Sequence, residues 1–146
     1  IFIIESLIIF LTDMVSTILK KIFKMNKIAV VGLSPNSERP SNYVSKYMLE
    51  NNYKIIPVNP FQKIILDRPC FPSLREIPFS IDVVNIFRNS KYVLPIIREA
   101  IYIKAKVIWL QDGIFSSQGK QMAKESNIIY IENDCVLRQH RSIYEK

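Results

Sequence analysis

The chain has 146 residues, about the length of one domain, and its 49% apolar and 23% charged residues are ordinary for a globular protein. Its two cysteines, Cys70 and Cys135, lie far apart, in neither a metal-ligand nor a redox spacing, and a single histidine, His140, cannot form a two-histidine metal site. These counts argue against a disulfide-rich secreted protein, predict no metal site and favour a cytoplasmic location. The net charge of +7 suits an anionic partner, although a lysine-rich, glycine-poor composition explains it equally well.

Residues 1–25 are predicted to form a helical segment ahead of the domain. The apolar run 1–11 is interrupted by Glu5 and followed by Asp13, so it falls short of the roughly 20 apolar residues of a membrane span, and no basic segment precedes it as in a signal peptide. A membrane partner is therefore not expected. From Thr12 or Asp13, as N-cap, apolar residues recur at helical spacing and predict a helix docked on the domain: Val15, Ile18, Leu19, Ile22 and Phe23. A membrane-surface helix and a partner interface are the alternatives.

After this segment, residues 26–146 alternate between strand-like apolar runs and helical patterns. The predicted strands are 27–33, 53–60, 81–87, 105–113 and 127–133. The predicted helices are 41–52, with Tyr43, Val44, Tyr47 and Met48 on its apolar face, then 91–104, 116–126 and a terminal helix or tail at 135–146. A proline-punctuated loop, 67–78, precedes the third strand. Short apolar strands separated by helices predict a Rossmann-like, doubly wound α/β domain of about five mainly parallel strands with helices on both faces.

In such a sheet, ligands bind outside the carboxyl ends of the strands. The segment that follows the first predicted strand is the most informative. Gly32 permits a sharp turn and close approach to the backbone, and the loop 33–39 runs into a helix that begins at Pro40. Arg39 adds a guanidinium that suits phosphate, and hydroxyl donors follow at Ser34, Ser37 and Ser41. The segment predicts a phosphate site, with an ordinary surface turn as the alternative.

Two features argue against an ordinary NAD site. The G-x-G-x-x-G spacing is absent after the first strand, and the second strand ends in Asn59 and Pro60 instead of an acid for the ribose hydroxyls.

The ordered blocks "VVGLSPNSERPSNYVSKYM", "IIPVNP", "CFPSLREIP", "DVVNIFRNSKYV", "AKVIWLQDGI" and "DC…RQH" resemble those of the small stand-alone CoA-binding domain proteins. That family is similar to the N-terminal domain of the succinyl-CoA synthetase α subunit. The resemblance covers the chain from about residue 14 to residue 141. It implies a Rossmann-like domain that binds coenzyme A or an acyl-CoA across the strand ends.

The residues that the resemblance implies around this ligand are Gly32, Ser34, Arg39, Pro40 and Ser41 at the phosphates, Asn59 and Pro60 at the adenosine, Phe87 and Arg88 along its path, and Gln111 and Gly113 at the pantetheine. One departure from the family pattern is Asp112, which stands where an apolar residue is usual and places a negative charge beside the expected pantetheine end.

No catalytic residue is predicted. His140 is expected on a helix surface or in the tail, with a ligand or anion contact as the alternative. Cys135 is expected to be a buried structural cysteine; the alternatives are a mixed disulfide with a thiol ligand or a nucleophilic role. Cys70 is expected to pack under Phe71.

The sequence therefore predicts a CoA-binding module that is not catalytic by itself and has no nucleic-acid partner. Two alternatives stand beside this prediction. The first is the nucleotide-binding part of a split acyl-CoA synthetase or ligase, whose catalytic domain would be a separate polypeptide and an enzyme partner. The second is an NAD(H)-binding redox sensor. The oligomeric state is left open.

Overall fold

In the computed structural model, which describes residues 1–145, five short strands form one parallel sheet in the order β2-β1-β5-β6-β7. The strands are β1 (Lys27–Val31), β2 (Lys54–Val58), β5 (Val83–Ile86), β6 (Val107–Leu110) and β7 (Ile129–Ile131). Four of them consist almost entirely of buried apolar residues, as expected for a sheet covered on both faces. The predicted Rossmann-like α/β fold is confirmed.

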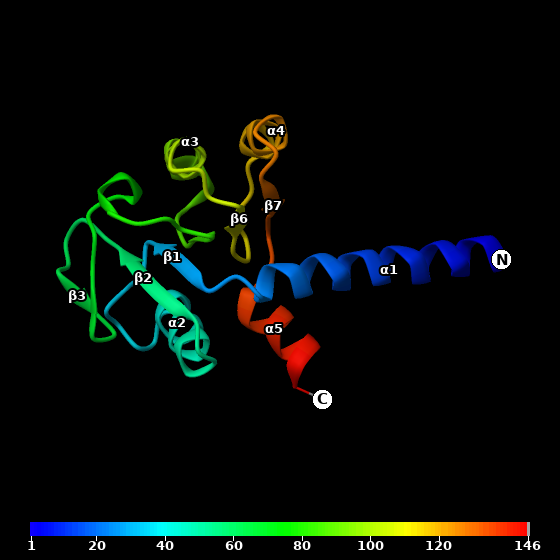
Figure 1. The fold of residues 1–146 in the computed structure, drawn as a ribbon, viewed down its shortest axis with the longest axis horizontal. Helices are drawn as coiled ribbons and strands as arrows, with labels where there is room; N and C mark the ends of the chain where they lie inside the picture. The colour runs from blue at the N-terminus through cyan, green and yellow to red at the C-terminus, as the bar shows by residue number, and fades with distance from the viewer. Residues whose placement is uncertain (146) are drawn as a thin grey trace.

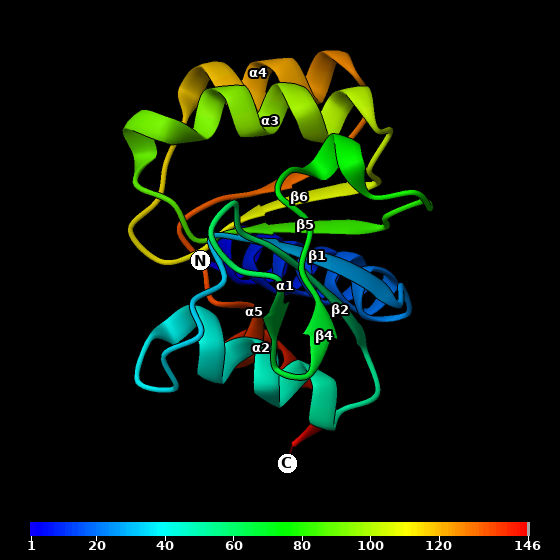
Figure 2. The same ribbon diagram turned by 90° about the vertical axis from the view of Figure 1, so that its left-hand side faces the viewer.

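Helices cover both faces of this sheet, as Figure 2 shows. Helices α3 (Val93–Tyr102) and α4 (Ser117–Glu125) lie on one face, and α2 (Pro40–Glu50) and α5 (Val136–Tyr144) lie on the other, together with the end of α1 (Phe2–Phe23). Because successive strand residues point to opposite faces, each strand contributes to both cores. In β1, Ala29 and Val31 belong to the core under α3 and α4, whereas Ile28 and Val30 belong to the other.

The segment predicted as a loop between the second and third strands contains a small hairpin, β3 (Ile64–Ile65) and β4 (Arg68–Pro69), and a 3₁₀ turn (Leu74–Glu76). Asp67 at the hairpin turn has a φ of 57°, a conformation that aspartate tolerates better than most residues. After the hairpin, Phe71 runs along the edge of β2: its amide donates to the carbonyl of Pro57, and its carbonyl accepts from the amide of Asn59. This contact covers part of an otherwise open sheet edge.

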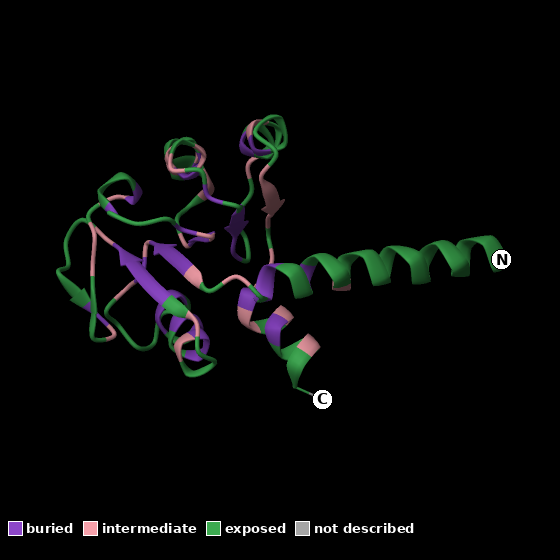
Figure 3. Ribbon diagram, viewed as in Figure 1, coloured by how far each residue is buried: buried purple, intermediate pink, exposed green. Residues whose placement is uncertain are grey.

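Helix α1 differs from the prediction in two ways. It is one continuous helix of 22 residues, so the expected division after residue 11 is wrong. Thr12, the expected N-cap, instead donates its hydroxyl to the carbonyl of Ile8, within the same helix. Only Leu19, Ile22 and Phe23 are buried, whereas Val15 and Ile18, expected to dock on the domain, are exposed. The helix projects away from the domain (Figure 1) and is exposed along most of its length (Figure 3).

The expectation that the N-terminal segment is too short for a membrane span therefore fails. By length and composition alone, helix α1 could cross a membrane, and almost all of its apolar stretch is exposed.

His140 is also misplaced by the sequence prediction. It lies on α5, is only 5% exposed and packs against the end of α1, and its Nδ1 lies 2.7 Å from the hydroxyl of Tyr47 in α2. The rings of Phe23, Tyr53 and Tyr144 pack around it. Burial lowers the pKa of His140. The histidine is a core residue and not the surface residue that was expected.

Candidate functional site

The strand order of the sheet marks the place where a ligand site is expected. From β1 the chain moves outward to β2 on one side, while β5, β6 and β7 extend on the other, so the order reverses between β1 and β5. Ligands of open α/β sheets bind in the crevice at the carboxyl ends of the strands at such a reversal. Here those ends lead into Gly32 and into Phe87 and Arg88.

Gly32 lies directly against the backbone that follows β5. Its φ is +84°, and a β-carbon at this position would lie 2.6 Å from the carbonyl oxygen of Phe87 and 3.0 Å from Cδ of Arg88. Its amide donates to the carbonyl of Val58 at 3.0 Å. Both the backbone conformation and the lack of space therefore require glycine here.

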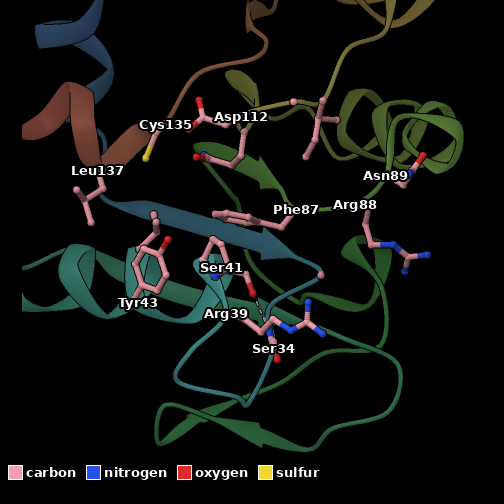
Figure 4. Close-up of a pocket in the computed structure, with 16 residues that line it drawn as sticks. Ser34, Arg39, Ser41, Tyr43, Phe87, Arg88, Asn89, Asp112, Cys135 and Leu137 are labelled. Atoms are coloured by element: carbon pink, nitrogen blue, oxygen red, sulfur yellow. Dashed lines mark hydrogen bonds between the residues drawn. The ribbon is translucent and has the colours of Figure 1, made fainter.

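A pocket of about 730 Å³ opens at this point, within the size range of small-molecule sites. It is bordered by the loop after β1, the first turn of α2, the segments after β5 and β6, and the start of α5. Figure 4 shows Arg39, Arg88 and Ser34 toward one end of this pocket, and Asp112, Cys135 and Leu137 toward the other, with Phe87 and Ser41 between them. The lining residues are Gly32, Ser34, Arg39, Pro40, Ser41, Tyr43, Val44, Phe87, Arg88, Asn89, Gln111, Asp112, Gly113, Ile114, Cys135 and Leu137.

The loop after Gly32 is shaped by its own side chains. The amide of Ser34 donates to Oγ of Ser41 at 3.0 Å, and Nδ2 of Asn42 donates to the carbonyl of Ser34 at 2.8 Å. Oγ of Ser34 accepts from the amide of Asn36 at 3.1 Å. Ser34 and Ser41 thus hold the loop as hydrogen-bond acceptors, and each hydroxyl keeps its own proton to donate to a ligand. Ser37 is exposed and lies outside the pocket.

The end of the pocket near this loop is cationic. Arg39 and Arg88 are both exposed, and within residues 1–145 neither forms a salt bridge. The guanidinium of Arg88 lies 5.1 Å from the ring centroid of Tyr92. Pro40 begins α2, whose N-terminal turn borders the same end and adds the positive end of a helix dipole. This end of the pocket therefore suits an anion.

The opposite end contains a buried polar side chain, Gln111, which is 3% exposed. Its Oε1 accepts from the amide of Val136 at 3.2 Å, while its Nε2 is buried and has no hydrogen-bond partner among the residues described. Buried donors are rarely left unpaired in native proteins. An unpaired donor in a pocket wall is a candidate contact for a ligand oxygen.

The negative charge expected beside this end is compensated. Arg138 of α5 forms two hydrogen bonds with the Asp112 carboxylate, at 3.0 and 2.8 Å, and a third with Asp134 at 3.0 Å. The Arg138 guanidinium lowers the pKa of Asp112. Arg138 thus offsets the unfavourable field that Asp112 would otherwise create for an anionic ligand.

Cys135 precedes α5 in this wall. It is half-buried, not fully buried as expected: it packs against the core on one side and lines the pocket on the other. Cys70 lies elsewhere, half-buried, with its Sγ 3.5 Å from the carbonyl of Asn59, and burial raises the pKa of its thiol.

Asn59 and Pro60 lie outside this pocket but close to it. They line a neighbouring hollow of about 340 Å³ that shares Gly32 and Arg88 with the main pocket. Nδ2 of Asn59 also donates to the carbonyl of Leu33 at 3.0 Å and so ties the end of β2 to the loop. Of the eleven predicted site residues, nine line the main pocket and these two line the hollow.

Residues 26–141 match the CoA binding domain family over most of the chain. The chain belongs to this family. The resemblance seen in the sequence blocks is thereby confirmed, and the pocket occupies the strand ends of a CoA binding domain.

Relatives of this CoA binding domain include proteins of similar length and one far larger protein. The uncharacterized protein YneT of Bacillus subtilis is 39% identical over 84% of this chain and 91% of its own length. A hypothetical protein from Pyrococcus horikoshii OT3, of solved structure, is 36% identical with a TM-score of 0.85, over 88% of this chain and 91% of that one. The ADP-forming acetate–CoA ligase II of Archaeoglobus fulgidus is 29% identical over 73% of this chain, which spans only 16% of the ligase.

Several pocket residues of this CoA binding domain were not predicted as site residues: Tyr43, Val44, Asn89, Ile114, Cys135 and Leu137. Tyr43 was assigned to the apolar face of α2, but it is 50% exposed and faces the pocket. Its place one turn into a helix that begins at the predicted loop was an available signal. For Leu137 no local signal existed, because its position depends on how α5 packs.

Proposed function

We propose that this chain binds coenzyme A, or an acyl-CoA, in the pocket at the carboxyl ends of β1, β5 and β6. The observation that carries the proposal is the polarity of the pocket along its length. Arg39, Arg88 and the first turn of α2 form a cationic end, and Leu137 and Cys135 border the other, where the charge of Asp112 is compensated by Arg138. Coenzyme A has the same division, because its charged phosphates lie on the nucleotide and its pantetheine arm is neutral.

The phosphate end rests on charge and on preformed geometry. Arg39 and Arg88 supply guanidinium forks that suit phosphate oxygens, and no neighbouring carboxylate within residues 1–145 occupies them. The loop between Gly32 and Ser41 is already held by hydrogen bonds, so ligand binding would cost little conformational entropy in this loop. The hollow at Asn59 and Pro60 adjoins this end and offers room for the adenosine.

The other end fits the pantetheine arm through Gln111. Its unpaired Nε2 would donate to an amide or thioester carbonyl of the ligand and would thereby gain the partner that it lacks in the free protein.

The proposed role is binding without turnover by this chain alone. The titratable residues of the pocket wall are Arg39, Tyr43, Arg88, Asp112 and Cys135. Asp112 is held by Arg138, and His140 is buried against Tyr47, away from the pocket. Cys135 therefore has no imidazole beside it to act as a general base.

Similarity to part of an acetate–CoA ligase favours a second candidate function. In that case the chain would supply the CoA-binding part of an acyl-CoA ligase whose catalytic chain is separate. Purified protein would then show no turnover alone and would gain it when mixed with that chain.

Isothermal titration with CoA, acetyl-CoA, ATP and NAD, on protein stripped of bound ligand, tests the proposal. CoA and acetyl-CoA should bind at micromolar concentration, with much weaker NAD binding.

Arg39→Ala should weaken CoA binding by about 1.5–3 kcal/mol if a charge-assisted phosphate contact is lost. Arg98→Ala is the matched control, because Arg98 is exposed on α3 and lies outside both the pocket and the hollow. Preference for NAD, or equal affinity in both variants, would refute the placement.

A further inference from the structure

The apolar part of α1 is the largest feature of the molecule that the pocket does not explain. From Phe2 to Ile18 its large apolar side chains are all at least 39% exposed, and Figure 3 shows this part of the helix clear of the domain. Exposed apolar surface of this extent marks an interaction site. The residues concerned are Phe2, Ile3, Ile4, Leu7, Ile8, Ile9, Phe10, Leu11, Met14, Val15 and Ile18.

The distribution of these side chains around the helix indicates what covers them. Consecutive residues on a helix point about 100° apart. The apolar runs 2–4 and 7–11 therefore face every direction around the axis, and one partner helix lying along one side would leave much of this surface in water. A medium that surrounds the helix on all sides is required.

We propose that α1 inserts into a lipid bilayer and anchors the pocket domain at the membrane surface. The part from Phe2 to Ile18 is about 26 Å long, a few ångströms short of the hydrocarbon core of about 30 Å, a difference that local thinning of the bilayer accommodates. The hydroxyls of Thr12 and Thr17 donate to the carbonyls of Ile8 and Asp13, at 2.9 and 2.8 Å. These groups thus need no water inside the bilayer.

The base of α1 carries the charge that suits a membrane surface. Lys20, Lys21 and Lys24 are exposed where the apolar part ends, and Lys21 shares a surface hollow with Lys104 and Lys106 of the domain. These lysines would attract anionic lipid headgroups. They would also place the domain on the cytoplasmic side, because lysine-rich segments beside a membrane-spanning helix stay on that side.

The anchor is continuous with the folded core. Ile22 and Phe23 are buried beside α2 and α5, and the hydroxyl of Tyr53 donates to the carbonyl of Phe23 at 2.6 Å. Loss of the whole helix would therefore remove core residues, unlike loss of a dispensable leader. Glu5 and Asp13 are the two charged side chains inside the apolar part, and Asp13, which is nearer its middle, is the weak point of the insertion.

The test uses the full chain expressed in bacteria, followed by alkaline carbonate extraction of the membranes. In a second assay the purified protein is reconstituted from detergent into phosphatidylcholine–phosphatidylglycerol vesicles, which are floated on a density gradient. The wild type should stay in the membrane pellet after carbonate extraction and should float with the vesicles in the second assay. The double variant Ile8→Glu/Leu11→Glu should reduce both fractions by about tenfold, and Asp13→Leu should strengthen retention.

The matched control is Phe61→Glu/Ile64→Glu, which adds the same charge at exposed apolar residues outside α1 and should float like the wild type. Circular dichroism melting of each variant checks the fold, and CoA titration of the α1 variants separates this inference from the function of the pocket.

Release of the wild type by carbonate would overturn the proposal. So would a detergent-free soluble dimer that Ile8→Glu/Leu11→Glu dissociates, because a second copy would then cover the helix. Digestion of the domain by protease added outside spheroplasts would overturn the orientation.

Discussion

The two walls of the pocket are held in place by contacts of different range. In the loop after β1, the hydrogen bonds among Ser34, Asn36, Ser41 and Asn42 join residues at most eight positions apart. At the start of α5, the amide of Val136 binds Gln111 across 25 positions, and Arg138 binds Asp112 across 26. The wall formed by the loop after β1, called the local wall below, can be recognised in the sequence. The wall formed by the start of α5 and the segment after β6, called the distant wall below, depends on how the elements pack in the folded chain.

The largest expected effect comes from Gly32, where the local wall meets the backbone that follows β5. Gly32→Ala should destabilise the protein by several kcal/mol and abolish CoA binding, because the new β-carbon would lie 2.6 Å from a backbone oxygen. Gly113→Ala is the matched control. Gly113 also has a positive φ, +79°, but no atom lies within 4 Å of the added carbon, so this variant should lose only about 1 kcal/mol for backbone strain. Chemical denaturation of both proteins measures the difference. Equal losses would mean that the close approach of Gly32 to Phe87 is not important.

The same contrast in range explains what the sequence revealed. All five strands of the sheet were predicted, because each is a short apolar run, and four of them are buried on both faces. The loop from Gly32 to Ser41 was recognisable for the same local reason. The burial of His140 and the pocket-facing position of Cys135 were not, because α5 is short and polar, and its position depends on packing against α1 and α2. The continuity of α1 was missed because Glu5 and Asp13 interrupt an apolar pattern without interrupting a helix.

A second prediction concerns Gln111 in the distant wall. Gln111→Leu removes the acceptor of the Val136 amide, a loss of about 1 kcal/mol, but it also removes an unpaired buried donor, so the free protein should change little in stability. Affinity for CoA should fall by about 1 kcal/mol, because the contact from Nε2 to a ligand carbonyl is lost. Titration and thermal melting of one preparation give both quantities. A drop in stability with unchanged affinity would assign Gln111 a structural role only.

A third prediction uses pH to test how α5 is held. Burial lowers the pKa of His140 below its ordinary value of 6.5, so the unfolded chain binds a proton more readily than the folded one. The resulting stabilisation is complete above the ordinary pKa and declines as the pH falls through 6.5 toward the lowered folded value. Urea unfolding between pH 8 and pH 5 should therefore show stability decreasing with acidity.

His140→Asn retains an acceptor near the Tyr47 hydroxyl but does not titrate, so its stability should vary less over this range. The pKa of Asp82 is lowered, against its partial desolvation, by the backbone amide of Lys27 and by Lys106, and the pKa of Asp112 is lowered by Arg138. Both carboxylates therefore titrate below the range of pH 5 to 8 in which His140 is compared. An unchanged pH profile in His140→Asn would show that the histidine is not the group responsible.

The smallest effect is expected at the rim of the distant wall. The pair of Arg138 and Asp112 is more than half exposed, and exposed ion pairs contribute only about 0–1 kcal/mol to stability. Arg138→Ala should therefore melt almost like the wild type, yet it leaves the Asp112 charge facing the pocket without compensation and should weaken CoA binding slightly. Restoring neutrality with Arg138→Ala/Asp112→Asn should recover most of that affinity. If the double variant binds no better than the single one, Arg138 acts on the ligand directly, and the distant wall then provides a cation as well as the contact from Gln111.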